Sequence, residues 1–284
     1  MVFTVKHKDL KAGVPLVVGI AILLLFLLWS FFPSMMAPFH PKEMFPPWAR
    51  PSSVHILGTN DMGYDIFSEL VYATATTLLT GVAASLISIF AGTAIGALAG
   101  YLEAWKAALI NLLIDVFLLI PMLPICIVLA SFLGPGTRRI IITISLLGWC
   151  STAKAVRSKT KQLKHADFIE SLQILGIPKI KIIFRHIIPN LWDVILARYI
   201  ISVANCIMLE ATISFVGLGD ITNVTWGGMI NFAFRRGGFT RGTLNWYIPP
   251  GVCIILCVQA FYCINMYLES RNKAVSGEGQ VYLD

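Results

Sequence analysis

The sequence has little charge for its length. Only 13% of its 284 residues are Asp, Glu, Lys or Arg, and 57% are hydrophobic, whereas about one-quarter of an average soluble domain is charged. The mean hydropathy is +0.77. So few polar side chains exclude a water-soluble fold, and we predict a membrane protein.

Several chemical motifs are missing as well. The six cysteines all lie in apolar stretches without CxxC spacing, so we predict neither a disulfide framework nor a cysteine metal site. The five histidines are too scattered to indicate a metal site; they are His7, His40, His55, His165 and His186. No GxxxxGK[ST] loop is present to hold nucleotide phosphates. We therefore expect no cofactor in this chain and no ATP hydrolysis by it.

Long uncharged runs are what the sequence does contain. The first, Val14–Phe32, is longer than a signal-peptide core of about 7–15 residues, and no small-residue cleavage site follows it, so we expect an uncleaved anchor. A membrane span needs roughly 20 residues. By this criterion five more spans follow: Thr77–Tyr101, Leu109–Leu133, Ile140–Ala155, Leu191–Val216 and Tyr247–Leu268. The predicted fold is all-α, a polytopic membrane protein with six transmembrane helices.

The excess of basic residues predicts the orientation. The net charge is +7, and 14 of the 22 Lys and Arg fall on one side of the predicted topology, eight of them between Lys154 and Arg185. Seven fall on the other side, and Arg198 lies inside the fifth span. Basic residues concentrate on the cytoplasmic side of membrane proteins. The distribution therefore predicts cytoplasmic N- and C-termini and removes the main support for nucleic-acid binding.

Two local patterns predict how the spans pack. Gly92, Gly96 and Gly100 recur every four residues in the second span, a spacing that lets another helix approach closely. Pro121 and Pro124 lie inside the third span, where each removes a backbone donor. We expect tight packing along the glycine face and a bend in the third helix.

The inner loop of about residues 154–190 is too patterned for a simple connector. Phe168, Leu172 and Leu175 have helical spacing in Ala166–Leu175, and Gly176 is placed to end that helix. Pro178 suits the first turn of a second helix. In that helix, apolar Ile180, Ile183, Phe184 and Ile187 oppose basic Lys179, Lys181 and Arg185. The pattern predicts a helix–glycine–helix loop, either a docking surface for a partner protein or a helix lying on the membrane.

The same loop resembles the EAA signature of ABC-importer permeases. The matching stretches are Phe168–Gly176 (FIESLQILG) and Arg185–Asn190 (RHIIPN), with Ser171 and Leu172 in place of the two alanines. Leu57–Asp65 (LGTNDMGYD), Leu209–Gly219 (LEATISFVGLG) and Thr225–Gly227 (TWG) are similar to motifs of the C-type subunit in the dipeptide, oligopeptide and nickel branch. Glu269–Asp284 does not resemble the usual ending of that branch.

The resemblance implies one half of a transmembrane pore. Its partners would be a second permease subunit, two cytoplasmic ATPase subunits, an extracytoplasmic substrate-binding protein and membrane lipid, in the inner membrane of a prokaryote. It implies residues 1–56 as a tail, first span and outer loop, 57–268 as the permease core and 269–284 as a cytoplasmic tail. The residues implied to couple to the ATPase are Asp167, Glu170, Ser171, Leu172, Leu175, Gly176, Pro178, Arg185, His186 and Pro189.

Three residues are candidates for the transport pathway. Asp115 and Glu210 are acids inside predicted spans, where ionisable groups are costly unless they have a function or a partner. For Asp115 we favour a position near the cytoplasmic entrance of its helix. Trp226 belongs to the TWG motif. Outside the spans, we expect Asn60–Leu70 to form a short helix across the rim of the bundle.

The substrate and one rival class remain open. Peptides are the first expected substrate, and nickel or a metal chelate is the alternative, because both occur in the branch that the sequence resembles. A secondary transporter is the rival class, but it would be expected to show inverted repeats or midplane ionisable residues. Neither that class nor a membrane scaffold explains the helix–glycine–helix loop.

Overall fold

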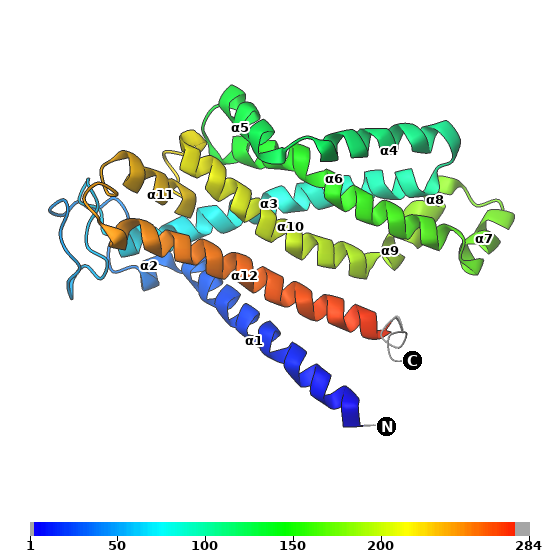
Figure 1. Cartoon of the computed structure of the whole chain (residues 1–284), viewed down its shortest axis with the longest axis horizontal. Helices are drawn as coiled ribbons and strands as arrows, with labels where there is room; N and C mark the ends of the chain where they lie inside the picture. The colour runs from blue at the N-terminus through cyan, green and yellow to red at the C-terminus, as the bar shows by residue number, and fades with distance from the viewer. Residues whose placement is uncertain (1–2, 276–284) are drawn as a thin grey trace.

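The computed structural model describes residues 3–275, and helices form nearly all of its regular structure (Figure 1). In chain order the helices are α1 Phe3–Phe31, α2 Pro33–Met36, α3 Ile66–Tyr101, α4 Ala104–Leu119, α5 Met122–Leu133, α6 Thr137–Lys164, α7 Asp167–Ile174, α8 Lys179–Ile182, η1 Ile183–Ile187, α9 Ile188–Asn190, α10 Trp192–Ile213, η2 Ser214–Leu218, α11 Trp226–Arg235 and α12 Leu244–Val275. Residues 3–275 include no β-strand. The predicted all-α fold is confirmed.

Five helices are long and apolar enough to cross a membrane, and a bent pair makes up to six spans. The bent pair corrects the third predicted span. Instead of one helix over Leu109–Leu133, α4 and α5 meet at 89°. Pro121 stands at the N-cap of α5 and Pro124 lies in its first turn. Because proline cannot donate the bond that would continue α4, the predicted bend becomes a complete break.

The second and fourth spans extend beyond their predicted bounds. α3 begins at Ile66, where Asp65 caps the helix by accepting a 2.8 Å bond from the Ser68 amide. The short rim helix expected over Asn60–Leu70 is therefore wrong: its second half is the first turn of α3, and its first half is a loop. α6 continues to Lys164 rather than ending near Ala155, because helical structure does not stop where hydrophobicity does.

The glycine face of α3 packs against α6, as predicted. A Cβ on Gly92 would lie 2.6 Å from the Trp149 carbonyl oxygen, and one on Gly96 would lie 2.5 Å from that of Ala153. A Cβ on Gly100 would lie 2.7 Å from the Arg157 carbonyl oxygen. These are sub-van der Waals distances, so only glycine allows the two backbones to approach so closely along three turns.

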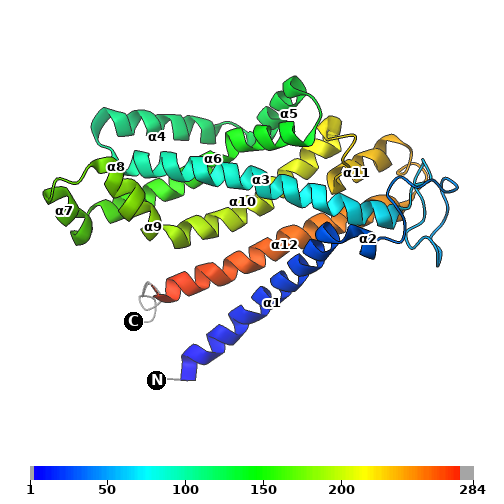
Figure 2. The same ribbon diagram turned by 180° about the vertical axis from the view of Figure 1, so that it is seen from behind.

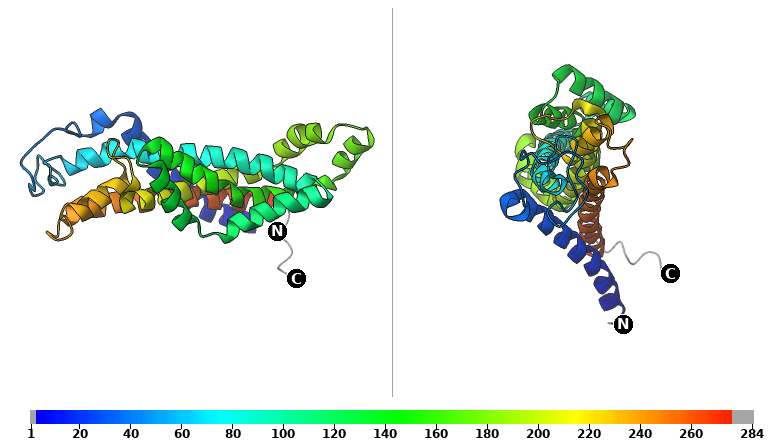
Figure 3. Two further views of the ribbon diagram at one scale, coloured as in Figure 1. Left: turned by 90° about the horizontal axis from the view of Figure 1, so that it is seen from above. Right: turned by 90° about the vertical axis from the view of Figure 1, so that its left-hand side faces the viewer.

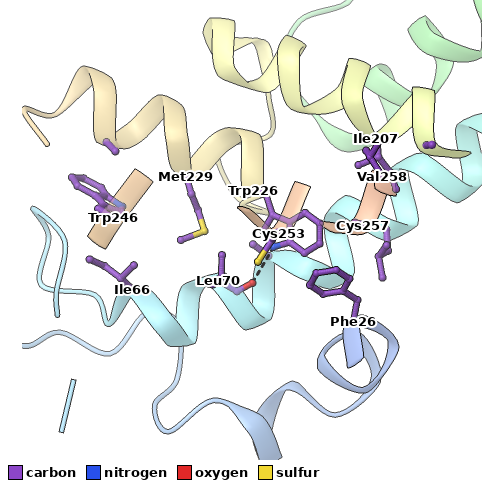
Figure 4. Packing of buried hydrophobic residues seen from close by; sticks show 14 of the residues in the cluster. Phe26, Ile66, Leu70, Ile207, Trp226, Met229, Trp246, Cys253, Cys257 and Val258 are labelled. Atoms are coloured by element: carbon purple, nitrogen blue, oxygen red, sulfur yellow. Dashed lines mark hydrogen bonds between the residues drawn. The ribbon is translucent and has the colours of Figure 1, made fainter. Parts of the chain in front are cut away.

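A hydrophobic cluster joins α1, α3, α10, α11 and α12 (Figure 4). At its centre Trp226 is fully buried against Phe26, with ring centroids 5.0 Å apart. The indole nitrogen of Trp226 donates to the Leu70 carbonyl oxygen at 3.2 Å. This cluster fixes α11 and the start of α12 to the rest of the bundle.

The elements divide between two ends of an elongated molecule (Figures 1 and 2). The loop before α3 and helix α11 lie at one end, and α7 lies at the other. The first turn of α1 and the last turns of α12 point toward the α7 end, as the view from above also shows (Figure 3). The predicted tail, residues 269–284, begins inside α12, and residues 276–284 lie outside the described part of the chain.

Candidate functional site

A helix–glycine–helix loop follows α6, at the position that the sequence predicts. The Ile177 amide donates to the Leu172 carbonyl oxygen at 3.2 Å, and the Gly176 amide donates to that of Gln173 at 3.0 Å. This pair of bonds is a Schellman ending, which requires a left-handed residue. Gly176 supplies it with φ of +70°. Pro178 is the N-cap residue of α8, so the chain reverses between Leu175 and Lys179.

The loop is packed firmly against the helical bundle. Ile169 of α7, together with Ile182, Ile183 and Ile187, has 0–1% of its surface exposed. These four side chains form one cluster with Ala97 and Tyr101 of α3 and Val156 of α6. Because interiors of this kind are close-packed, α7 and the α8–α9 segment are expected to move together with the C-terminal ends of α3 and α6.

The two apolar faces predicted for the loop differ from those observed. In α7 the buried residue is Ile169, with Leu172 half-buried, while Phe168 and Leu175 are 45% and 75% exposed. In the second segment, Ile183 and Ile187 are buried but Ile180 and Phe184 are 58% and 53% exposed. In the second segment the physical reason is that Ile183–Ile187 is a π-helix, whose longer turn disrupts the spacing of an α-helix. In α7 the buried side is the one that packs on α3 and α6.

Large apolar side chains are therefore left uncovered on this loop. We call Phe168, Ile174, Leu175, Ile180 and Phe184 the docking face; Ile174 is the most exposed, at 87%. Charged groups accompany it: Asp167, Glu170 and Arg185 are exposed. Exposed apolar groups of this size next to charged residues are typical of protein contact sites.

The remaining predicted coupling residues occupy different positions. Ser171 is exposed, and its hydroxyl donates to the Asp167 carbonyl oxygen at 2.8 Å. Glu170 lies 3.8 Å from His165 in a weak, exposed pair. His186 is half-buried, and its carbonyl oxygen accepts a bond from the Asn190 side chain. Pro189 lies in α9, so it belongs to the segment that leads into α10.

A polar brace holds the start of the loop. The Lys164 ammonium donates to the Glu103 carboxylate and also lies 5.6 Å above the Tyr101 ring. The hydrogen bond and charge of Lys164 hold the pKa of Glu103 below its usual range. The brace joins the end of α6 to the turn between α3 and α4.

The three pathway candidates do not form one site. Glu210 is fully buried and accepts a 2.6 Å bond from the Ser214 hydroxyl. Trp226 is buried near it, because Gly227 packs directly on Ala211. Asp115 lies apart on α4, half-exposed and 3.8 Å from the Lys154 ammonium. Their role in transport stays a prediction. If Glu210 takes part in transport, Glu210→Gln should reduce uptake or its coupling to ATP hydrolysis.

Sequence reasoning missed two polar clusters at the opposite end. The Asn60 side chain donates to buried Glu69 at 3.2 Å, and Arg236 lies 3.5 Å from Asp61. The first contact fastens the loop before α3 to the start of α3, and the second fastens this loop to the segment after α11. No local spacing signals the second contact, because Asp61 and Arg236 lie far apart in the sequence.

The second missed cluster is centred on Asp220. Its carboxylate accepts bonds from the amide and hydroxyl of Thr137 at 3.0 and 2.8 Å and from the hydroxyl of Thr222 at 2.6 Å. Partial burial raises the pKa of Asp220, but bonds from Thr222, Thr137 and Asn223 outweigh it and hold this pKa well below its usual range. The cluster ties the start of α6 to the loop between α10 and α11.

Comparison with known proteins agrees with this architecture. Residues 92–274, from the middle of α3 to the end of α12, match the model of the family described as binding-protein-dependent transport system inner membrane component. The chain belongs to this family. It is thus a multi-pass inner-membrane transport component, and the loop carrying the docking face lies inside the matched region.

Named relatives are similar over most of their length. The glutathione transport system permease protein GsiD of Pectobacterium atrosepticum is 31% identical over 260 residues, covering 90% of this chain and 85% of the relative. The dipeptide transport system permease protein DppC of Alkalihalophilus pseudofirmus is 30% identical, with 90% and 84% coverage. The oligopeptide permease protein OppC of Bacillus subtilis is 29% identical, with 88% and 79% coverage.

Proposed function

We propose that this permease is one subunit of an ATP-driven importer of peptides and forms half of its transmembrane pore. The observation that carries the proposal is the docking face, which presents five exposed apolar side chains on a segment anchored to α3 and α6. ATP hydrolysis takes place in two cytoplasmic ATPase subunits. A second permease subunit and an extracytoplasmic binding protein complete the complex.

In the proposed mechanism the ATPase subunit grips α7 through the docking face. ATP-driven closure of the ATPase pair displaces α7, and the packing of Ile169 and Ile183 transmits this displacement to the inner ends of α3 and α6. The bundle then alternates between two arrangements, one in which the pore opens inward and one in which it opens outward. The stiff Schellman ending at Gly176 keeps α7 and α8 at a fixed angle during the movement.

Peptide is proposed over nickel because of the relatives. Their names specify glutathione, dipeptide and oligopeptide transport. Glutathione is itself a tripeptide, so the three substrates share amide groups and terminal carboxylates. Three relatives whose names specify peptide substrates favour a pathway for peptides over a pathway for a metal chelate.

The proposed topology has both termini and the α7 end in the cytoplasm. It is supported by the charge distribution, in which eight basic residues lie between Lys154 and Arg185. A cysteine at Ser158, which is exposed, should react with an impermeant thiol reagent in inside-out vesicles only. Reaction in intact spheroplasts would contradict the orientation.

Cross-linking tests the docking face against the alternative of a helix lying on the membrane. A photoactivatable residue at Ile174, 87% exposed, should cross-link to the ATPase subunit in the assembled complex. The matched control is Ile169, with 0% exposure on the same helix, which should cross-link only within the permease. Capture of lipid by Ile174 in the assembled, transporting complex would refute the docking proposal.

Uptake measurements test the lever mechanism, in which α7 passes the movement of the ATPase subunit to the helical bundle. Glu170→Arg reverses an exposed charge on α7, and Gly176→Pro removes both the left-handed turn and the Gly176 amide bond. Each variant should insert normally but show reduced ATP-dependent peptide uptake. Wild-type uptake by both variants would exclude the lever mechanism.

A further inference from the structure

Helix α10 carries polar side chains on a face that the rest of the chain leaves open. Arg198, Asn205 and Thr212 are separated by seven residues each, so they lie on one slightly inclined stripe of the helix. Arg198 and Asn205 are exposed, and Thr212 is half-buried. Met208 is 52% exposed and Phe215 is 40% exposed beside them. We call these five residues the α10 stripe.

The stripe lies within a membrane-crossing segment. Trp192–Leu218 is one of the helices long and apolar enough to span. At 1.5 Å per residue, Asn205 lies about 20 Å from the Trp192 end, close to the middle of the segment. In Figure 1, α10 runs between α6 and α12, and α3 lies behind it. The opposite side of α10 is the packed one, since Val203 and Ile207 are buried there.

Exposure to lipid does not suit these groups. A side-chain amide in hydrocarbon loses its hydrogen bonds to water, and a charged side chain within a span costs several kcal/mol unless it meets water or a partner. Among the described residues, Asn205 forms one side-chain hydrogen bond: the Tyr262 hydroxyl of α12 donates to its amide oxygen at 3.3 Å. The amide NH2 of Asn205 is therefore still available to an acceptor from outside the subunit.

Arg198 distinguishes an aqueous path from a packed subunit contact. Among the residues whose side chains the structure describes (13–103 and 105–271), none of the ion pairs involves its guanidinium. A second protein surface packed against this guanidinium would have to supply a carboxylate to offset the cost of burying the charge. A water-filled path hydrates it, and a carboxylate passing through such a path can bind it with two parallel bonds.

We propose that the α10 stripe, with Tyr262, lines the peptide path, and that Arg198 binds the C-terminal carboxylate of the passing peptide. This inference rests on the proposed function and adds the residues that meet the substrate. Asn205, Tyr262 and Thr212 exchange hydrogen bonds with peptide amides. Met208 is flexible and polarisable, which suits contact with side chains of different shape.

Cysteine accessibility in the full transporter tests the path itself. Asn205→Cys should react with a positively charged, membrane-impermeant methanethiosulfonate, and reaction should block uptake. Leu24→Cys is the matched control, because Leu24 is 54% exposed in the middle of the α1 span and should react only with a membrane-permeant maleimide. The background is a Cys263→Ser chain, since Cys263 is the one native cysteine that is not buried.

The labelling results either support or overturn the path. Reaction at Asn205→Cys that is slowed several-fold by a transported peptide supports the proposal. A failure of the charged reagent to reach Asn205→Cys, in a complex that transports peptide, overturns it by placing the stripe against lipid or the second subunit. Wild-type complex that takes up no peptide refutes the proposed function instead, and the reagent still reports separately whether the stripe meets water.

Carboxylate recognition is tested with two forms of one peptide. With the same binding protein, Arg198→Gln should lower the ratio of free-acid to C-terminally amidated peptide uptake roughly tenfold, the effect of about 1.4 kcal/mol. Arg198→Lys, which keeps the charge but cannot make two parallel bonds, should restore part of the ratio. ATPase activity stimulated by the binding protein shows that the variants assemble. An equal loss for both peptides would overturn the assignment of Arg198.

Discussion

The packing of Ile169 makes the lever mechanism quantitatively testable. Ile169→Ala removes three carbon atoms from a side chain with 0% exposure, in the cluster that joins α7 to α3 and α6. The lost transfer free energy is about 0.8 kcal/mol for each carbon, and the remaining cavity adds to it. We expect the attachment of α7 to weaken by about 3 kcal/mol, which is more than a hundredfold in its equilibrium constant.

The expected result is uncoupling rather than loss of the ATPase. In Ile169→Ala, α7 still offers the docking face, but its displacement no longer reaches the bundle. Backbone amides of α7 should exchange hydrogen faster, and the number of ATP molecules hydrolysed per peptide imported should rise. Ile174→Ala is the control: with 87% exposure it should weaken binding of the ATPase subunit and leave the ATP-to-peptide ratio unchanged.

Two outcomes would refute this reasoning. If the α7 amides exchange at the wild-type rate in Ile169→Ala, the packing does not hold the helix. If exchange accelerates while the ATP-to-peptide ratio stays at the wild-type value, α7 is loose but coupling continues, and the proposed rigid transmission from Ile169 to the C-terminal ends of α3 and α6 is wrong.

Three further predictions concern glycines and Asp220. Gly96→Ala should lower the unfolding free energy by about 1–3 kcal/mol, because the new Cβ would lie 2.5 Å from the Ala153 carbonyl oxygen; Gly251→Ala in α12, with nothing within 4 Å, should be neutral or stabilising in the same thermal unfolding assay. Gly176→Ala should cost only about 1–2 kcal/mol of left-handed backbone strain, because no atom lies within 4 Å of its Cβ, so uptake should exceed that of Gly176→Pro. Asp220→Asn should destabilise by about 1–2 kcal/mol, discounted for exposure, whereas exposed Glu43→Gln should have no effect in thermal unfolding. Because the pKa of Asp220 is lowered in the folded state, the contribution of its carboxylate to the unfolding free energy is fully present above the ordinary pKa of about 3.9. This contribution should disappear as the pH falls below that value. An equal loss of stability in Asp220→Asn at every pH would contradict this.

Local patterns in the sequence predicted the elements whose causes are local. Uninterrupted apolar runs set the number of spans, because a bilayer accepts only long helices or closed barrels. Gly176 and Pro178 marked the turn between α7 and α8, since each residue has an intrinsic backbone preference. The Gly92–Gly96–Gly100 spacing identified the contact face of α3. None of these features depends on a distant part of the chain.

The predictions that were wrong concern features that depend on contacts with distant parts of the chain. Which side of α7 is buried depends on where α3 and α6 end, and this selected Ile169 over Phe168 and Leu175. Proline at 121 ends α4, but the direction that α5 takes after the break depends on α6, against which Cys126 and Ala130 pack. Periodicity states that a helix has an apolar face, but not which residues a neighbour will cover.

The sequence by itself determined a membrane-embedded helical protein with a patterned loop, because hydrophobicity, glycine and proline act through the solvent and the local backbone. Only the tertiary structure decided which apolar side chains of that loop stay uncovered, which distant residues Asp220 and Asp61 contact, and which side of α10 remains open. These properties depend on distances between helices, and such distances follow from packing rather than from any single segment.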